Sequence, residues 1–222
     1  MTSAKSETRK MNGTEKQPNS AEEMRQAVLA SEVVDFPNAV RPEVVRLLGL
    51  YVAQNRDSND RKDLIAVGSA IRKMVAYAPG SELGSLAEIL DSKGRLTIPI
   101  EIELEVAKTV VRKLTKHPEL ANQIGEELET RLWEITQTYV TPRLIGRAKY
   151  GATALNAFIA LLLLRGKHAQ EAIRWVTSSQ TNWFKDSARS RSKKLLETLR
   201  VQVTSDAYES ASKYVLEFVN QN

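Results

Sequence analysis

Apolar residues recur three and four positions apart along most of the chain, the spacing that puts them on one face of an α-helix. Proline, glycine and polar clusters separate these stripes, as residues that end helices do. The pattern predicts ten helices, at residues 21–34, 42–53, 60–78, 82–90, 98–116, 118–140, 148–164, 168–179, 182–200 and 205–220. Only one segment has the alternating pattern of a β-strand, so the sequence predicts an all-α fold.

The exception lies at residues 96–106, where apolar and polar residues alternate strictly. Alternation favours a strand, but the apolar residues from Ile100 to Leu114 also follow helical spacing. As a helix, the segment would carry glutamates at its N-terminal end and lysine and arginine at its C-terminal end, which the helix dipole favours. Pro99 suits the first turn. We therefore predict a helix at residues 98–116.

The stretch DSKGRLTIP, at residues 91–99, contains the motif G-R-L-T-I-P. It resembles the short signature of the swapped-hairpin transition-state regulators and antitoxins, which bind DNA as dimers. That family needs further strands directly after the motif, whereas helical patterns follow here without a hairpin turn. Gly94 then suits a helix end and Pro99 a helix start. We expect residues 92–97 to form a loop between two helices.

Short connections between the predicted helices imply antiparallel neighbours, either in a closed bundle or in a stack of helix pairs. The second helices of the pairs begin near residues 60, 98, 148 and 182, and these spacings bracket the repeat length of HEAT and armadillo proteins. First helices with an early proline (RPEVVRLL, HPELANQI) and second helices rich in small and branched residues (DLIAVGSAIRKMV, YGATALNAFIALLLL) also resemble that superfamily. The resemblance implies a right-handed stack of antiparallel helix pairs, a HEAT-like α-solenoid, which offers a binding surface rather than a chemistry. A single helical bundle is the alternative fold.

The composition favours an intracellular setting. The chain has no cysteine, which excludes disulfides and thiolate metal sites. Residues 1–19 contain no apolar run and are expected to be a disordered tail, followed by a single helical-repeat domain at residues 20–222. The longest apolar run, from Ala154 to Leu164, is too short for a membrane span, which needs roughly 20 residues. We expect a cytoplasmic protein that does not engage a membrane.

No catalytic or cofactor motif emerges from the sequence. His117 and His168 have no partner at a metal-ligand spacing such as H-E-x-x-H. His117 is expected beside the end of the preceding helix, and His168 at the surface near a helix start. Adjacent acids such as Glu126 and Glu127 point to different sides of a helix and are expected to be solvated. We therefore expect no enzyme activity, no cofactor and no metal ion.

Positive charge is concentrated in one region. Residues 141–200 contain 12 Lys and Arg against 3 Asp and Glu, while the whole chain carries only +5. Such asymmetry indicates an acidic partner. Within the region, WFKDSARSRSKKLLETLR (183–200) would form a helix with an apolar face and basic flanks. The candidate contacts to an acidic partner or to nucleic acid are Lys185, Arg189, Arg191, Lys193, Lys194 and Arg200.

These patterns predict a non-catalytic binding or scaffold module that engages a protein partner. The alternative is a nucleic-acid-binding protein that uses a basic surface within residues 143–200, and an enzyme of unrecognised type comes third. Some helical-repeat proteins, alkylation-repair glycosylases among them, bind DNA along a basic concave surface. Their catalytic aspartate and aromatic cradle are not identified in this sequence, so the resemblance does not imply their activity.

Overall fold

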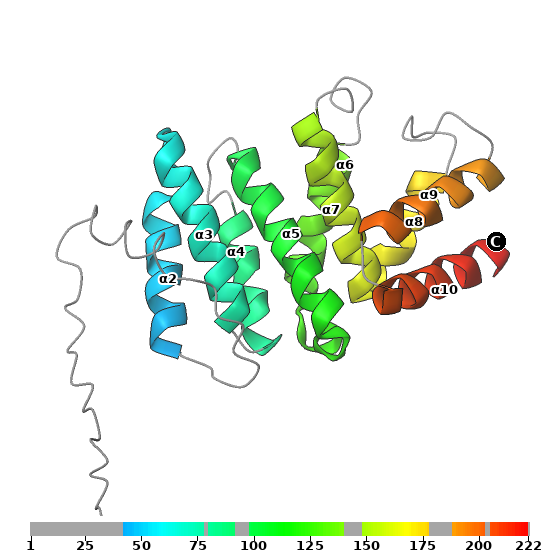
Figure 1. The fold of residues 1–222 in the computed structure, drawn as a ribbon, viewed down its shortest axis with the longest axis horizontal. Helices are drawn as coiled ribbons and strands as arrows, with labels where there is room; N and C mark the ends of the chain where they lie inside the picture. Colours follow the sequence, from blue (N-terminus) through cyan, green and yellow to red (C-terminus); the bar gives the residue numbers. More distant parts are fainter. Residues whose placement is uncertain are drawn as a thin grey trace, which may run out of the picture.

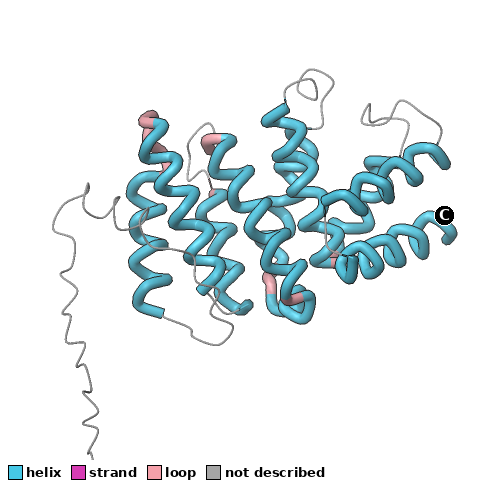
Figure 2. The backbone as a smooth tube through the Cα atoms, in the orientation of Figure 1, coloured by secondary structure: helices cyan, strands magenta, loops and turns pink. Residues whose placement is uncertain are grey.

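The structure, a computed structural model, describes residues 42–77, 80–91, 98–139, 148–177, 188–202 and 205–221. Every regular element in these ranges is a helix, which confirms the predicted all-α fold (Figure 2). The predictions made for the tail at 1–19, the helix at 21–34 and the loop at 92–97 concern residues outside these ranges.

The helices follow one another along the molecule in the order of the sequence, from α2 at one end to α10 at the other (Figure 1). In this view α2 to α7 run up and down, whereas α8 to α10 lie across the picture. The α-helices are α2 (Pro42–Asn55), α3 (Arg61–Tyr77), α4 (Leu86–Leu90), α5 (Ile100–Lys116), α6 (Glu126–Tyr139), α7 (Ala148–Leu164), α8 (Lys167–Thr177), α9 (Ala188–Gln202) and α10 (Ser205–Gln221). Two 3-10 helices, η1 (Gly80–Ser85) and η2 (Pro118–Gln123), precede α4 and α6.

Helices α3, α5 and α7 lie in one layer, because α5 packs against α3 on one side and against α7 on the other. Helix α2 packs on α3, and α6 packs on α7. An ion pair joins Glu101 in the first turn of α5 to Lys149 in the first turn of α7, so these two helices run in the same direction. Tyr139, at the end of α6, donates a hydrogen bond to Glu103 near the start of α5. Helix α6 therefore runs in the opposite direction.

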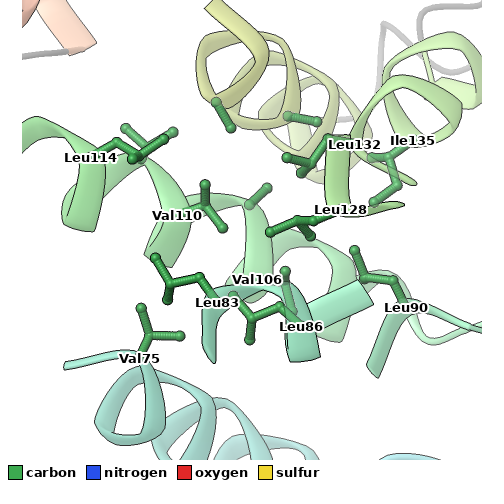
Figure 3. Packing of buried hydrophobic residues seen from close by; sticks show 14 of the residues in the cluster. Val75, Leu83, Leu86, Leu90, Val106, Val110, Leu114, Leu128, Leu132 and Ile135 are labelled. Atoms are coloured by element: carbon green, nitrogen blue, oxygen red, sulfur yellow. The ribbon is translucent and has the colours of Figure 1, made fainter. Parts of the chain in front are cut away.

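One hydrophobic cluster extends through the described helices from α2 to α10. Figure 3 shows its middle part, where side chains of η1, α4, α5 and α6 converge. Val106, Val110, Leu128 and Leu132 are fully buried there. Their four-residue spacing puts each pair on the inner side of its own helix. Because a fully buried aliphatic side chain stabilises a fold by about 1.5–3 kcal/mol, this packing holds α5 and α6 in one core with α4 and α7, which pack on both helices.

The helix predicted at residues 98–116 is confirmed from Ile100 onward. The competing strand is wrong, because residues 100–106 lie within α5. The structure buries Ile102 and Val106 completely, while Ile100 and Leu104 stay partly exposed. Helical packing on two neighbours, α3 and α7, thus explains an apolar pattern that imitates a strand.

Two other predicted helices are interrupted. The helix predicted at 118–140 consists of η2, a break at Ile124 and Gly125, and α6. Ile124 has an extended backbone, and a glycine inside a helix costs about 1 kcal/mol relative to alanine. Helix α6 then starts afresh with three glutamates in its first turn, where the dipole favours them. Of the helix predicted at 82–90, only α4 is α-helical, and the residues before it belong to the 3-10 helix η1.

The apolar run predicted to be a buried helix forms most of α7. Phe158, Leu161 and Leu162 are fully buried, since α5 and α6 both pack against this helix. None of the helices in the described ranges has the length and apolar character needed to cross a bilayer.

A buried arginine ties α2 to α4. Arg56, which directly follows α2, donates from its Nη1 to the carbonyl oxygens of Glu88 and Ile89, each at 2.8 Å. These carbonyls lie at the end of α4, where a helix has acceptors without intrahelical partners. The guanidinium therefore caps α4 and fixes its position beside α2.

Candidate functional site

Helix α9 carries part of the basic set selected from the sequence. Its described and exposed members are Lys193, Lys194 and Arg200. Leu199 is fully buried, as the predicted apolar face requires. Lys185 lies outside the described residues. Arg189 and Arg191 fall within α9, but their side chains are not among those described.

A carboxylate interrupts this basic flank. Lys193, Glu197 and Arg200 are four and three positions apart, which places them on one side of the helix. Glu197 is exposed, and so is Val201, with 80% of its surface open to solvent. The described part of α9 thus presents three cations around one acid and one apolar residue, rather than a continuous positive strip.

A second basic surface, which was not predicted from the sequence, lies on α3 and α5. It lies on the side of α5 opposite the buried residues Val106 and Val110. Arg61 and Arg112 are exposed, and Ile65 is 54% exposed. We call this surface the α3–α5 face, and its members are Arg61, Ile65, Arg72, Glu105, Lys108, Arg112 and Lys116.

Contacts between α3 and α5 hold the two halves of the face side by side. Arg72 Nη1 lies 3.1 Å from Oε1 of Glu105. Farther along both helices, Lys113 Nζ lies 3.4 Å from the carbonyl oxygen of Ala76. The order of these contacts shows that α3 and α5 run in the same direction. Gly68, one turn before Arg72, also lies beside Glu105, since a Cβ there would meet the Glu105 side chain at an ordinary contact distance of 3.5 Å.

Lys108 and Arg112 form the centre of the α3–α5 face. They are one helical turn apart, and Lys116 follows after another turn. Neither Lys108 nor Arg112 has an ion pair with any described carboxylate. Like charges at this spacing destabilise a helix by about 0.2–0.5 kcal/mol per pair. This electrostatic cost would be relieved by an anionic partner.

Counting charge over long windows hides this face. Residues 1–140 contain 19 Lys and Arg against 21 Asp and Glu, so their net charge is slightly negative. The sequence feature that could predict this face is the four-residue spacing of Lys108, Arg112 and Lys116 in a segment predicted to be helical. The sequence prediction assigned Arg112, Lys113 and Lys116 to the helix dipole and did not consider Lys108.

An acid–tyrosine cluster lies where the first turns of α5 and α7 meet the end of α6. The Tyr139 hydroxyl donates to Glu103, and the Tyr139 ring lies 5.3 Å from that of Tyr150. Burial raises the pKa of Glu103 to about 7, although the hydrogen bond from Tyr139 opposes this. The hydrogen bond from Lys149 lowers the pKa of Glu101 at the rim of the cluster. Glu103 can therefore exchange a proton near neutral pH, which a solvent-exposed glutamate does not do.

His168 is not the surface residue that the sequence suggested. Its side chain is only 12% exposed, and its ring stacks on Trp133 at 6.2 Å between ring centres. Ring Nδ1 lies 2.8 Å from Oε2 of Glu171, and Nε2 lies 3.4 Å from Oγ1 of Thr130. The His168 backbone N–H donates to Oε1 of Glu129 at 2.6 Å. These contacts join the start of α8 to α6.

The remaining expected polar positions agree with the structure. His117 follows α5, and its backbone N–H donates to the carbonyl of Lys113 at 2.9 Å. Glu126 and Glu127 are exposed. Among the described residues, no group of three histidine or acidic side chains is arranged to hold a metal ion.

The fold and its surfaces define an all-helical protein with two exposed groups of cations, on α9 and on the α3–α5 face. Comparison with known protein families, with curated proteins and with solved structures found no match. The activity of the chain is therefore inferred from the surfaces that its helices present.

Proposed function

We propose that the chain is a non-catalytic binding protein of HEAT-like helix pairs that engages a protein partner in the cytoplasm. The observation that carries this proposal is the layer formed by α3, α5 and α7, in which neighbouring helices run in the same direction. In proteins made of stacked helix pairs, such a layer forms an extended binding surface.

The exposure of this layer supports the proposal. Helices α2 and α6 cover one side of it, and the core uses that side. On the other side, Ile65 of α3, Arg112 of α5 and Lys149 of α7 are exposed. A closed bundle would cover its central helix all round, whereas α5 exposes Arg112 and Lys116 and leaves Glu101, Leu104 and Lys108 partly exposed.

Affinity capture on the immobilised full chain tests this function. A lysate of the source cell is divided, and one half is treated with nuclease before capture. We expect the same protein to be retained from both halves, in a fixed ratio to the bait. Retention that disappears after nuclease treatment, or no retained protein at all, would contradict a protein-binding function.

Nucleic-acid binding through residues 143–200 is the second candidate, because Lys193, Lys194 and Arg200 are exposed together on α9. Glu197 between them weakens it, since a carboxylate repels phosphate. Titration of a random duplex and a single strand at two salt concentrations tests it. The triple variant R189A/K193A/R200A should reduce the salt slope by about 2 to 3, at about 0.7–0.9 per phosphate contact.

A further inference from the structure

We propose that the α3–α5 face binds an acidic polypeptide segment that also carries apolar side chains. The inference rests on the proposed protein-binding function and names the surface and the class of partner. It begins from the two cations at the centre of the face, Lys108 and Arg112, which no described carboxylate neutralises.

The helix dipole does not account for these two cations. The basic residues in the last turn of α5 are Lys113 and Lys116, and they suit the negative end of the helix. Lys108 and Arg112 lie before that turn, where the dipole contributes little. Arg112 is exposed, so it does not serve the core either. A partner with negative charge is a physical reason for a ridge of cations one turn apart.

The ridge has the dimensions of a short peptide contact. Lys108, Arg112 and Lys116 span eight residue steps, or about 12 Å at 1.5 Å per residue. An extended polypeptide covers that distance with about four residues at about 3.3 Å each. Alternate side chains of such a segment point to the same side, so two or three acidic side chains can reach the three cations.

The neighbouring ridge on α3 supplies an apolar contact. Arg61, Ile65 and Arg72 lie on one side of α3, since they are four and seven positions apart. Ile65 is 54% exposed between the two arginines. The ion pair of Arg72 with Glu105 places this ridge directly beside that of α5. Because Ile65 lies two turns before Arg72, a segment that runs from Arg112 back towards the start of α3 meets the cations of α5 first and then an exposed isoleucine between two arginines.

A polypeptide fits this face better than nucleic acid does. Duplex DNA presents a charge about every 1.7 Å and binds best to a long strip of uninterrupted cations. Here Glu105 lies within the face and Glu101 lies one turn before it on α5. Neither carboxylate offers a phosphate a contact, and a phosphate would gain nothing from Ile65. An acidic segment with leucine or isoleucine can place each side chain type against its complement.

The test measures binding of a labelled peptide to the full chain by fluorescence anisotropy. The peptide carries glutamates and then leucines at alternate positions, so that both residue types point to the same side of an extended segment. The same peptide with glutamine in place of glutamate, a random duplex and a single strand are the comparison ligands. The variant is K108E/R112E, and K193E/R200E on α9 is the matched control because it reverses the same two residue types elsewhere. Circular dichroism and thermal unfolding establish that each variant is folded, and K108Q/R112Q replaces the first variant if it is not.

We expect the glutamate peptide to bind wild type and the α9 variant alike, and K108E/R112E to raise its Kd about tenfold, because exposed ion pairs contribute modestly each. Ile65→Ala should raise Kd about threefold. The inference is overturned if K108E/R112E binds as tightly as wild type, if the glutamine peptide binds equally well, or if either nucleic acid binds more tightly than the peptide and depends on the same two residues.

Failure of this inference is distinguishable from failure of the proposed function. A protein captured equally by wild type and by K108E/R112E would leave the binding function in place and would remove the α3–α5 face as its site. No captured protein at all would overturn the function, while the peptide titration would still report directly on the face.

Discussion

Replacing Glu103 with glutamine tests whether a buried carboxyl controls the stability of the α5–α6–α7 contact. Burial raises the pKa of Glu103 from 4.5 to about 7, so the folded protein keeps a proton that the unfolded chain releases. A raised carboxyl pKa makes the unfolding free energy greatest below pH 4.5 and lowers it as the pH rises through 7. Glutamine stays neutral at every pH and can still accept the hydrogen bond from Tyr139.

The magnitude follows from the size of this pKa change. A rise from 4.5 to about 7 corresponds to about 3 kcal/mol, at about 1.4 kcal/mol per pKa unit. This is an upper value, because water that reaches the carboxylate reduces the cost of its charge. Glu103→Gln should therefore match wild type near pH 4 and exceed its unfolding free energy by up to about 3 kcal/mol near pH 8.

Urea unfolding followed by circular dichroism, from about pH 4 to about pH 8, measures this difference. Glu101→Gln is the matched control on the same helix, because Lys149 lowers the pKa of Glu101. That variant should lose stability at neutral pH and approach wild type in acid, which is the opposite sign. If the curves of wild type and Glu103→Gln run parallel across the whole range, the carboxyl is solvated and the reasoning is refuted.

Three further substitutions test local features by the same unfolding measurement. Arg56→Ala removes two hydrogen bonds from a charged donor to the end of α4 and should cost about 3 kcal/mol; a loss below about 1 kcal/mol would contradict the capping role. Arg165, at the end of α7, has a left-handed backbone with φ 57°, so Arg165→Gly should gain about 0.5–1 kcal/mol, and a loss would show that its side chain matters more than its backbone. Gly166→Ala should cost about 1–3 kcal/mol, because the new Cβ would overlap the Glu129 carboxylate that receives the His168 N–H; unchanged stability would mean that Glu129 moves freely.

Helices could be predicted from the sequence wherever the apolar stripe is long. The stripes of α3, α5 and α7 appear in the structure with most of their apolar residues buried, because burial of a stripe is the main force that selects a helix. The break at Gly125 was missed, since Ala121 and Ile124 continue the stripe and still pack against the core. An apolar stripe indicates which residues are buried, but whether the helical backbone is continuous depends on local helix propensity.

Tertiary partners were less predictable than helices. The sequence predicts His168 to be a surface or turn residue because it lies near the start of a helix. Its cover comes from Trp133 and Glu129, which lie more than thirty residues earlier on α6. The pKa of Glu103 likewise depends on Tyr139 and on burial beneath two other helices. Such properties arise only after the helices have packed, so they cannot be predicted from a local sequence pattern.

Helix α5 shows how one sequence pattern can contain both a structural and a functional signal. Its glutamates at the start and its lysines in the last turn satisfy the dipole, and its inner residues satisfy the core. Subtracting these two requirements leaves Lys108 and Arg112, which neither packing nor the dipole demands. Exposed cations that folding does not need are also the ones whose replacement should leave stability nearly unchanged, within about 0.5 kcal/mol each. Substitution of these two residues is therefore expected to leave the protein folded and to abolish binding of the partner. The same substitutions on an ordinary solvated helix would change neither the fold nor binding.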